Sequence, residues 1–169
     1  MAGSKDPKNL LFPRIFAWSM IILFLLVYLY IGQLYVAYGP SMEPTLHSGE
    51  RILVDKKAYQ AVKPATGNVV ALVNPDNSSL LFVKRVAAEG GDEVEVSSGG
   101  VKVNFKLEPN TAGFWKSAKY TLKEDEVFVL GDNRLKSSDS REFGPVKVDK
   151  ILGKVKMVIW PPASFRIVR

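Results

Sequence analysis

The chain has 169 residues, with 23 Lys and Arg against 17 Asp and Glu, and this length fits about one domain. The net charge of +6 is modest and scattered, so it does not give the concentrated basic face that nucleic-acid binding usually needs. The absence of Cys and the single His exclude disulfides, thiolate or multi-His metal sites and a Cys nucleophile. Any catalysis must therefore use Ser, Thr, Lys, carboxylates or Tyr, and we expect no metal, no cofactor and no nucleic-acid partner.

The first expected element is a membrane span over residues 15–37. No charged residue occurs between Ile15 and Met42, and about 20 apolar residues suffice to cross a bilayer. The alternatives are a cleaved secretory signal, which has a shorter apolar core and a small-x-small cleavage site, and a buried helix of a soluble protein. Tyr rings, which suit the headgroup layer, crowd the second half of the run: Tyr28, Tyr30, Tyr35 and Tyr38. We therefore predict a retained signal anchor.

Basic residues set the expected orientation of this anchor. Lys5, Lys8 and Arg14 precede the span, and positive flanks stay cytoplasmic. We expect residues 1–14 to be cytoplasmic, and residues 38–169 to form a domain on the opposite side of the membrane.

The rest of the chain is rich in short runs of Val, Ile, Leu and Phe, bounded by Gly, Pro, Asn and Ser, which is typical of strands. A hairpin is expected around Ser97–Gly100, and no convincing amphipathic helix follows Tyr38. Residues 106–125 are expected to be irregular, with Phe114-Trp115 either inserted into a surface or packed in the ordinary way. The prediction is a compact antiparallel β domain with partly closed, barrel-like sheets. The expected strands are Arg51–Asp55, Asn68–Val73, Leu80–Ala87, Glu93–Val96, Val101–Phe105, Glu126–Leu130 and Ile151–Ile159.

The first segment with potential chemistry directly follows the span. Pro40 and Pro44 fix the backbone on both sides of Ser41, and Gly39 permits close backbone approach. A hydroxyl on a stiff turn suits a nucleophile, but the same composition suits a plain juxtamembrane turn. The nearby His47 would have to fold back across Pro44 to build a Ser–His–Asp arrangement, so we expect it to be a surface or turn residue.

The second segment places a lysine among apolar neighbours. In a strand over residues 80–87, Phe82 and Val86 share a face with Lys84. Burial penalises the charged form, and lowering its pKa by about two to three units would make Lys84 a useful base. The alternative is an edge-strand lysine whose amine reaches water.

The third segment, residues 129–141, is a strand that runs into a turn dense in polar groups. Such groups can form a charge-assisted hydrogen-bond network that braces the loop and aims a hydroxyl at a neighbouring lysine. The alternative is a solvated surface turn. The expected members of the network are Asp132, Asn133, Arg134, Asp139 and Arg141.

In order along the chain, these segments resemble the conserved boxes of type I signal peptidases, the membrane-anchored Ser–Lys proteases that remove signal peptides from exported proteins. The resemblance covers most of the chain, and its collinear order makes it specific. It includes the N-terminal anchor and the segments Ser41–Leu46, Gly67–Val70, Phe82–Val86, Gly91–Val94, Gly131–Arg134, Ser137–Arg141, Gly153-Lys154 and Trp160-Pro161.

The resemblance implies a role for each matching residue. Ser41 corresponds to the nucleophile, Lys84 to the general base and Ser137 to the hydroxyl that positions the lysine amine. Gly39, Pro40 and Met42 fall in the substrate-pocket and oxyanion region, and the polar loop residues listed above fall in the supporting loop. The implied fold is the mainly β signal-peptidase type, and the implied partners are preprotein signal peptides and a lipid bilayer.

The sequence also departs from the family pattern. Many members have a Ser where this chain has Gly39, so the second donor to the oxyanion stays open. Asn68 stands where an Asp is common, and Leu135-Lys136 stand where polar residues are frequent.

The sequence thus predicts a single-pass endopeptidase in a plasma, thylakoid or other organellar membrane, with its catalytic domain outside the cytoplasm. The alternatives are a processing protease for one pilin or conjugation substrate, and a catalytically silent, membrane-tethered β binding module.

Overall fold

The computed structural model describes residues 13–23, 32–75, 77 and 79–169, and it divides into a unit that ends at Gln33 and a second unit, Leu34–Arg169. Residues 13–23 are helical. In the described part of the chain, no helix is both long and apolar enough to cross a membrane. The predicted cytoplasmic residues 1–12 and residues 24–31 of the predicted span lie outside the described residues, so the anchor stays a prediction.

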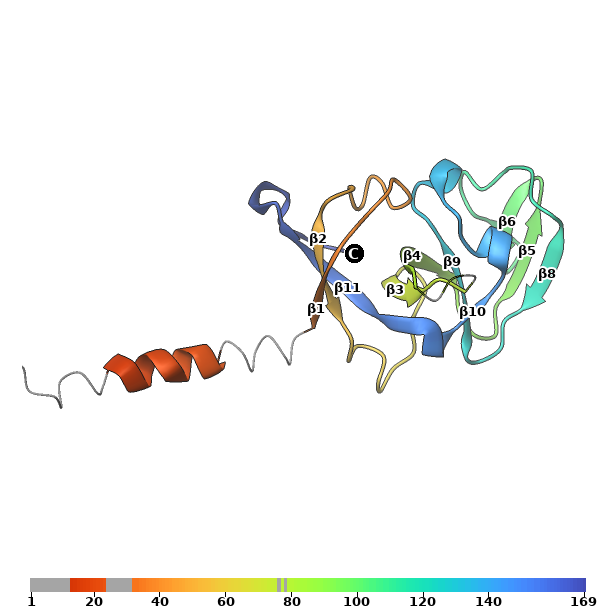
Figure 1. The fold of residues 1–169 in the computed structure, drawn as a ribbon. Helices are drawn as coiled ribbons and strands as arrows, with labels where there is room; N and C mark the ends of the chain where they lie inside the picture. The colour runs from red at the N-terminus through yellow and green to blue at the C-terminus, as the bar shows by residue number, and fades with distance from the viewer. Residues whose placement is uncertain (1–12, 24–31, 76, 78) are drawn as a thin grey trace, which may run out of the picture. The chain divides into compact units, whose positions relative to one another are not determined.

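Two antiparallel sheets build the second unit (Figure 1). The larger sheet has the open strand order β1-β2-β11-β3-β4-β9-β10, with β12 paired to β11. Its strands are β1 (Gln33–Val36), β2 (Arg51–Asp55), β3 (Val69–Val73), β4 (Leu81–Ala88), β9 (Glu126–Leu130), β10 (Val146–Lys147), β11 (Ile151–Trp160) and β12 (Arg166–Ile167). The smaller sheet has the order β7-β6-β5-β8, from β5 (Glu93–Ser97), β6 (Gly100–Val103), β7 (Lys106–Leu107) and β8 (Ala118–Thr121).

Helical structure in the second unit is short. The helix α2 (Ser140–Phe143) follows β9, and Asp139 caps its N-terminus by accepting a hydrogen bond from the Arg141 backbone N–H. Single 3₁₀ turns cover Arg134–Lys136, Val148–Lys150 and Pro162–Ser164. The segment from Gly131 to Phe143 is therefore a compact, turn-rich connection between β9 and β10.

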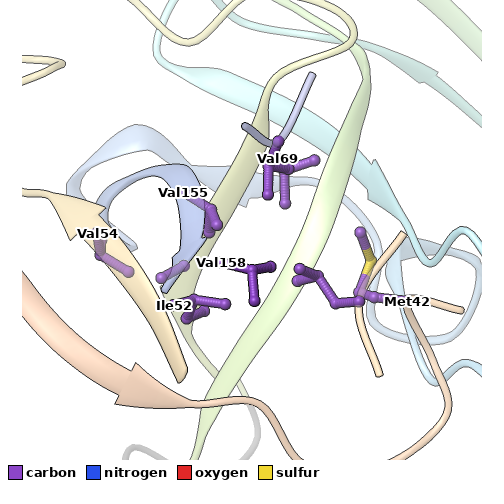
Figure 2. Close-up of a cluster of buried hydrophobic side chains, with 9 residues drawn as sticks. Met42, Ile52, Val54, Val69, Val155 and Val158 are labelled. Atoms are coloured by element: carbon purple, nitrogen blue, oxygen red, sulfur yellow. The ribbon is translucent and has the colours of Figure 1, made fainter. Parts of the chain in front are cut away.

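The larger sheet is covered on both faces because the side chains of β3 alternate between two apolar clusters. Val69 and Ala71 join the first cluster, which also holds Met42 and residues of β2 and β11 (Figure 2). Val70 and Leu72 join a second cluster with residues of β4, β9 and β10. The chain after β1 thus packs Met42 onto the face of the sheet that Val69 and Ala71 share, whereas Lys84, which pairs with Val70, alternates to the other face.

The mainly β prediction is confirmed, and the seven expected strands overlap β2, β3, β4, β5, β6, β9 and β11 with ends that differ by at most two residues. The expected hairpin is β5–β6, in which Ser97 pairs with Gly100. The prediction that residues 106–125 are irregular was wrong in part, because β7 and β8 lie inside this segment. The strand β8 forms by pairing with β5. Residues 33–36, expected at the end of the membrane span, form the strand β1.

Candidate active site

Ser41 lies on a tight turn that starts just after β1. The turn is closed by hydrogen bonds from the Glu43 N–H to the Pro40 carbonyl (3.2 Å) and from the Leu46 N–H to the Met42 carbonyl (2.9 Å). Gly39 has φ of +81°, a left-handed conformation that favours glycine. The half-buried Ser41 also accepts a hydrogen bond at its carbonyl from the Asn133 N–H (3.0 Å), which ties the turn to the polar loop.

A pocket of about 450 Å³ brings the Ser41 turn and Lys84 together. Gly39 and Met42 also line this pocket, whereas the exposed Pro40 is not among its lining residues. In the described part of the chain no hydrogen bond joins the Ser41 hydroxyl to the Lys84 amine, and catalytic hydrogen bonds are often long without substrate. The remaining walls are mostly apolar: Tyr35, Val36, Ala37, Tyr38, Leu46, Ala71, Leu80, Leu81, Phe82 and Val83, with Ser79 and Ser138.

Lys84 is buried, with 3% of its surface exposed. It lies in a central strand, paired with Val70 of β3, so the alternative of an exposed edge lysine is wrong. Its Nζ lies 5.0 Å from the centre of the Phe82 ring. Burial lowers its pKa from 10.5 to about 8; the charge of Arg141 adds to this decrease, and Asp139 and Glu142 oppose it. A substantial fraction of the amine is therefore neutral at mildly alkaline pH.

The next residue, Arg85, points into a polar network that the sequence reasoning missed. Its guanidinium donates to both Asp132 carboxylate oxygens (2.8 and 2.7 Å) and to the carbonyl of Gly67 (2.7 Å). The Thr45 hydroxyl donates to the same carboxylate. Burial would raise the pKa of Asp132, but the hydrogen bonds from Arg85 and Thr45 outweigh it and lower that pKa. The sequence signal was present, since Thr45, Arg85 and Asp132 stand in three different matching segments.

A second ion pair lies deeper in the loop. The Arg141 guanidinium donates from Nε and Nη2 to the two Asp139 oxygens (2.7 and 2.8 Å), and these side chains are 1% and 0% exposed. Asp139 also accepts from the Gly131 N–H (3.0 Å). Arg141 Nη2 further donates to the carbonyls of Arg134 (2.8 Å) and Ser137 (3.3 Å). Further backbone groups thus surround the paired charges, which offsets part of the cost of burying them.

Ser137 sits beside the Ser41 turn and has spare hydrogen-bonding capacity. It is buried, and in the described part of the chain its hydroxyl oxygen has no hydrogen-bond partner. A Cβ on Gly131 would lie 2.6 Å from the Ser41 carbonyl oxygen and would overlap the Ser137 hydroxyl. Only glycine therefore fits between these two serines, and a buried hydroxyl without a partner calls for a functional explanation.

The polar loop is arranged differently from expectation, whereas His47 lies at the surface as predicted. The loop does not form one self-contained network: Asp132 pairs with Arg85 of β4, whereas Arg134 approaches Glu108 at 3.6 Å. Asn133 contributes its backbone N–H to Ser41. His47 is exposed, and its Nδ1 lies 3.9 Å from Glu43, with no part in lining the pocket.

The chain combines a mainly β fold with a pocket that joins a serine turn and a buried lysine. Sequence comparison identifies the class of hydrolase that has these features. The model of the signal peptidase family, peptidase S26, matches residues 11–160. The chain belongs to this family, and it is a serine peptidase.

Relatives come from bacteria and from organelles. Signal peptidase I of Bacillus amyloliquefaciens is 33% identical over 83% of this chain and 80% of its own length. The mitochondrial ATP-independent inner membrane protease subunit 1b of Arabidopsis thaliana is 35% identical over 80% of this chain and 75% of its own. The thylakoidal processing peptidase 1 of the same plant is 35% identical, and the match spans 41% of its length.

Among solved structures, a signal peptidase I from Enterococcus faecalis is 26% identical, with a TM-score of 0.42. That alignment covers 54% of this chain and 96% of the other.

Proposed function

We propose that this chain is a membrane-bound endopeptidase that cleaves signal peptides from exported preproteins, with Ser41 as nucleophile and Lys84 as general base. The observation that carries the proposal is the pocket shared by the Ser41 turn and the buried Lys84. An ordinary lysine is almost fully charged at neutral pH, whereas burial lowers the Lys84 pKa to about 8 and makes the amine available as a base.

In the proposed mechanism, the neutral Lys84 amine takes the proton of the Ser41 hydroxyl while its oxygen attacks the scissile carbonyl. The Ser41 backbone N–H stabilises the oxyanion of the tetrahedral intermediate. Lys84 then returns the proton to the leaving amine, which yields an acyl-enzyme. Lys84 next takes a proton from water as it attacks the ester, and then returns it to Ser41 as the acid product leaves.

The Ser137 hydroxyl is proposed to position the amine of Lys84. It is buried and has no hydrogen-bond partner among the described residues, and it adjoins the Ser41 turn across Gly131, so it is available to donate to the neutral amine. The paired Asp139 and Arg141 and the paired Asp132 and Arg85 are proposed to support the loop, because each pair fixes it to a different strand or helix.

The substrate is proposed to be an extended peptide with small side chains near the cleavage site. The pocket has mostly apolar walls from the β1 segment and the start of β4, and β1 is an edge strand of the larger sheet. An extended ligand can add to the edge of a sheet through main-chain hydrogen bonds, and its alternate side chains then enter pockets.

The test uses the detergent-solubilised chain with a preprotein and compares the wild type with Ser41→Ala. Ser98→Ala, in the exposed turn between β5 and β6, is the matched control. We expect wild type and Ser98→Ala to release the signal peptide, and Ser41→Ala to release none. Cleavage by Ser41→Ala at the wild-type rate would exclude the proposed nucleophile.

A membrane anchor that starts at residue 15 and ends before β1 is proposed with the N-terminus in the cytoplasm, because residues 33–36 belong to the larger sheet. The absence of Cys permits a clean topology test, since each introduced thiol is the only one in the chain. We expect a membrane-impermeant maleimide to label Ser98→Cys in intact bacterial cells that carry the chain in their plasma membrane, and Ser4→Cys only after permeabilisation. The reverse pattern would contradict the proposed orientation.

A further inference from the structure

Trp115 is an aromatic residue outside the pocket whose ring is held rigidly. Its Nε1–H donates to the Thr111 carbonyl (2.8 Å), and the Thr111 hydroxyl in turn accepts from the Val101 N–H (2.9 Å) of β6. A Cβ on Gly113 would lie 2.7 Å from the Trp115 Nε1. The ring also packs against an apolar cluster that the smaller sheet shares with β4 and β9. The loop before β8 therefore fixes the ring in one position.

The Trp115 ring covers the Arg141 guanidinium. The Arg141 Cζ lies 4.3 Å from the ring centre, and the arginine side chain is 1% exposed. A cation on the face of an indole is attracted to it, and the attraction is largest when both are removed from water. Phe114, the neighbouring aromatic residue, is instead fully exposed, so only one of the two adjacent rings has this role.

Arg141 connects the ring to the proposed catalytic residues. The guanidinium binds both oxygens of Asp139 and the carbonyl of Ser137. Asp139 binds the Gly131 N–H, and Gly131 contacts both Ser137 and Ser41. A displacement of the guanidinium would therefore shift the Ser137 hydroxyl and the wall beside Ser41.

We propose that Trp115 is a positioning residue for the Ser–Lys site, which acts by covering Arg141 and so holding Asp139 and Ser137 in place. This inference rests on the proposed function. It assigns a task in the reaction to the smaller sheet, which otherwise stands apart from the pocket.

The proposal predicts the direction of a pH effect. In the intact protein the charge of Arg141 lowers the pKa of Lys84. Without the ring, water reaches Arg141 and screens this charge, so its effect on the pKa of Lys84 becomes smaller. Water entry also weakens the burial that is the main cause of the low pKa of Lys84. Both changes raise the pKa of Lys84, so the acid limb of the activity profile moves to higher pH.

The experiment measures kcat/KM against pH for the full chain in detergent and for Trp115→Leu, which keeps an apolar side chain but loses the aromatic face. Trp115→Phe tests rescue by a ring, and Phe114→Leu is the matched control. For Trp115→Leu we expect the midpoint of the acid limb to move to higher pH by about one unit, which lowers kcat/KM at neutral pH about tenfold. Trp115→Phe should lie between, and Phe114→Leu should match the wild type.

A purely structural role would lower the melting temperature of Trp115→Leu without moving the acid limb, and that result overturns the proposal. If Trp115→Leu does not fold, a chain with Trp18→Phe and Trp160→Phe is prepared with ring-fluorinated tryptophan, so that only Trp115 carries the label. Fluorination weakens the attraction between the ring and the Arg141 cation with little change of shape. An acid limb that is independent of fluorination is then the overturning result. Ser41→Ala, run in parallel, separates the two hypotheses, because only failure of the proposed function leaves cleavage independent of Ser41.

Discussion

Two adjacent cations of β4, Lys84 and Arg85, meet opposite environments. Lys84 is 3% exposed, lies near an aromatic ring and has a lowered pKa. Arg85 donates hydrogen bonds to the Asp132 carboxylate and to two carbonyls, and its pKa is raised, mainly by the bond to Asp132. Since neighbouring strand residues point to opposite faces, one strand carries a desolvated amine and an ion pair side by side.

The difference shows how burial and pairing separate the roles of similar side chains. Burial without a counter-ion favours the neutral amine, which can act as a base. Pairing with a planar carboxylate suits the guanidinium, which stays charged and holds two segments together. Exchanging these environments should therefore cost activity at one position and stability at the other.

The largest effect is expected at Lys84. Lys84→Ala and Lys84→Arg should both lower kcat/KM by about 10³-fold or more, because the first removes the base and the second replaces it with a permanently charged group. Preprotein cleavage measures this, and circular dichroism checks that the β domain stays folded. Substantial turnover by either folded variant would remove Lys84 from the proposed role.

At Arg85 the main loss should be in stability. Arg85→Ala leaves the Asp132 carboxylate without its main partner, and removing one member of such a pair should lower the free energy of unfolding by about 3 kcal/mol. Arg85→Lys keeps the charge but not the two-pronged geometry, so it should fall between Arg85→Ala and wild type. Urea unfolding measures both. Equal stability of all three chains would mean that the network does not hold the Ser41 turn to β4.

In contrast to Arg85→Ala, the Lys84→Met substitution should increase the free energy of unfolding. The folded-state pKa of about 8 lies below the ordinary 10.5, so the buried charge destabilises the native state below about pH 8. Between pH 8 and 10.5 the unfolded state binds more protons, and wild-type stability therefore rises with pH. Lys84→Met should be more stable than wild type by about 3 kcal/mol at pH 7, and this difference should shrink towards pH 10.5. A pH-independent difference would show that Lys84 is not desolvated.

The same pKa predicts the activity profile. The kcat/KM of the wild type should rise about tenfold per pH unit below pH 8 and level off above it, as the amine loses its proton. Arg85→Lys should keep this midpoint, because Arg85 lies on the other face of β4. A shift of the midpoint in Arg85→Lys would mean that the two faces are coupled.

Much of this arrangement could be predicted from local sequence. The strands are short apolar runs between turn residues. The alternation of Lys84 with Phe82 and Val86 made its burial one of two possible interpretations, and the pairing of β4 with both β3 and β9 decides between them. The two-residue strands β10 and β12 carry too little pattern to be recognised, and they form only by pairing with longer neighbours.

The partners of the polar loop could not be predicted, because they lie far apart in the chain. Asp132 is 47 residues from Arg85 and 87 from Thr45, and nothing in the local sequence chooses Arg85 over the nearer Arg134. Likewise, the sequence does not distinguish the exposed Phe114 from the packed Trp115, since that difference depends on Arg141 lying opposite one ring.

The smallest effect is expected at His47, the only imidazole in the chain. Its side chain is exposed, and the Glu43 carboxylate 3.9 Å away is itself partly exposed, so their interaction should contribute little. The His47 N–H that binds Glu50 (2.9 Å) belongs to the backbone and survives substitution. His47→Ala should therefore keep the kcat/KM and the acid limb of the wild type. A lost or shifted acid limb in this variant would indicate that the imidazole of His47 is the base. The contrast between Lys84 and Arg85 would then fail, because the group that titrates near pH 8 would not be Lys84.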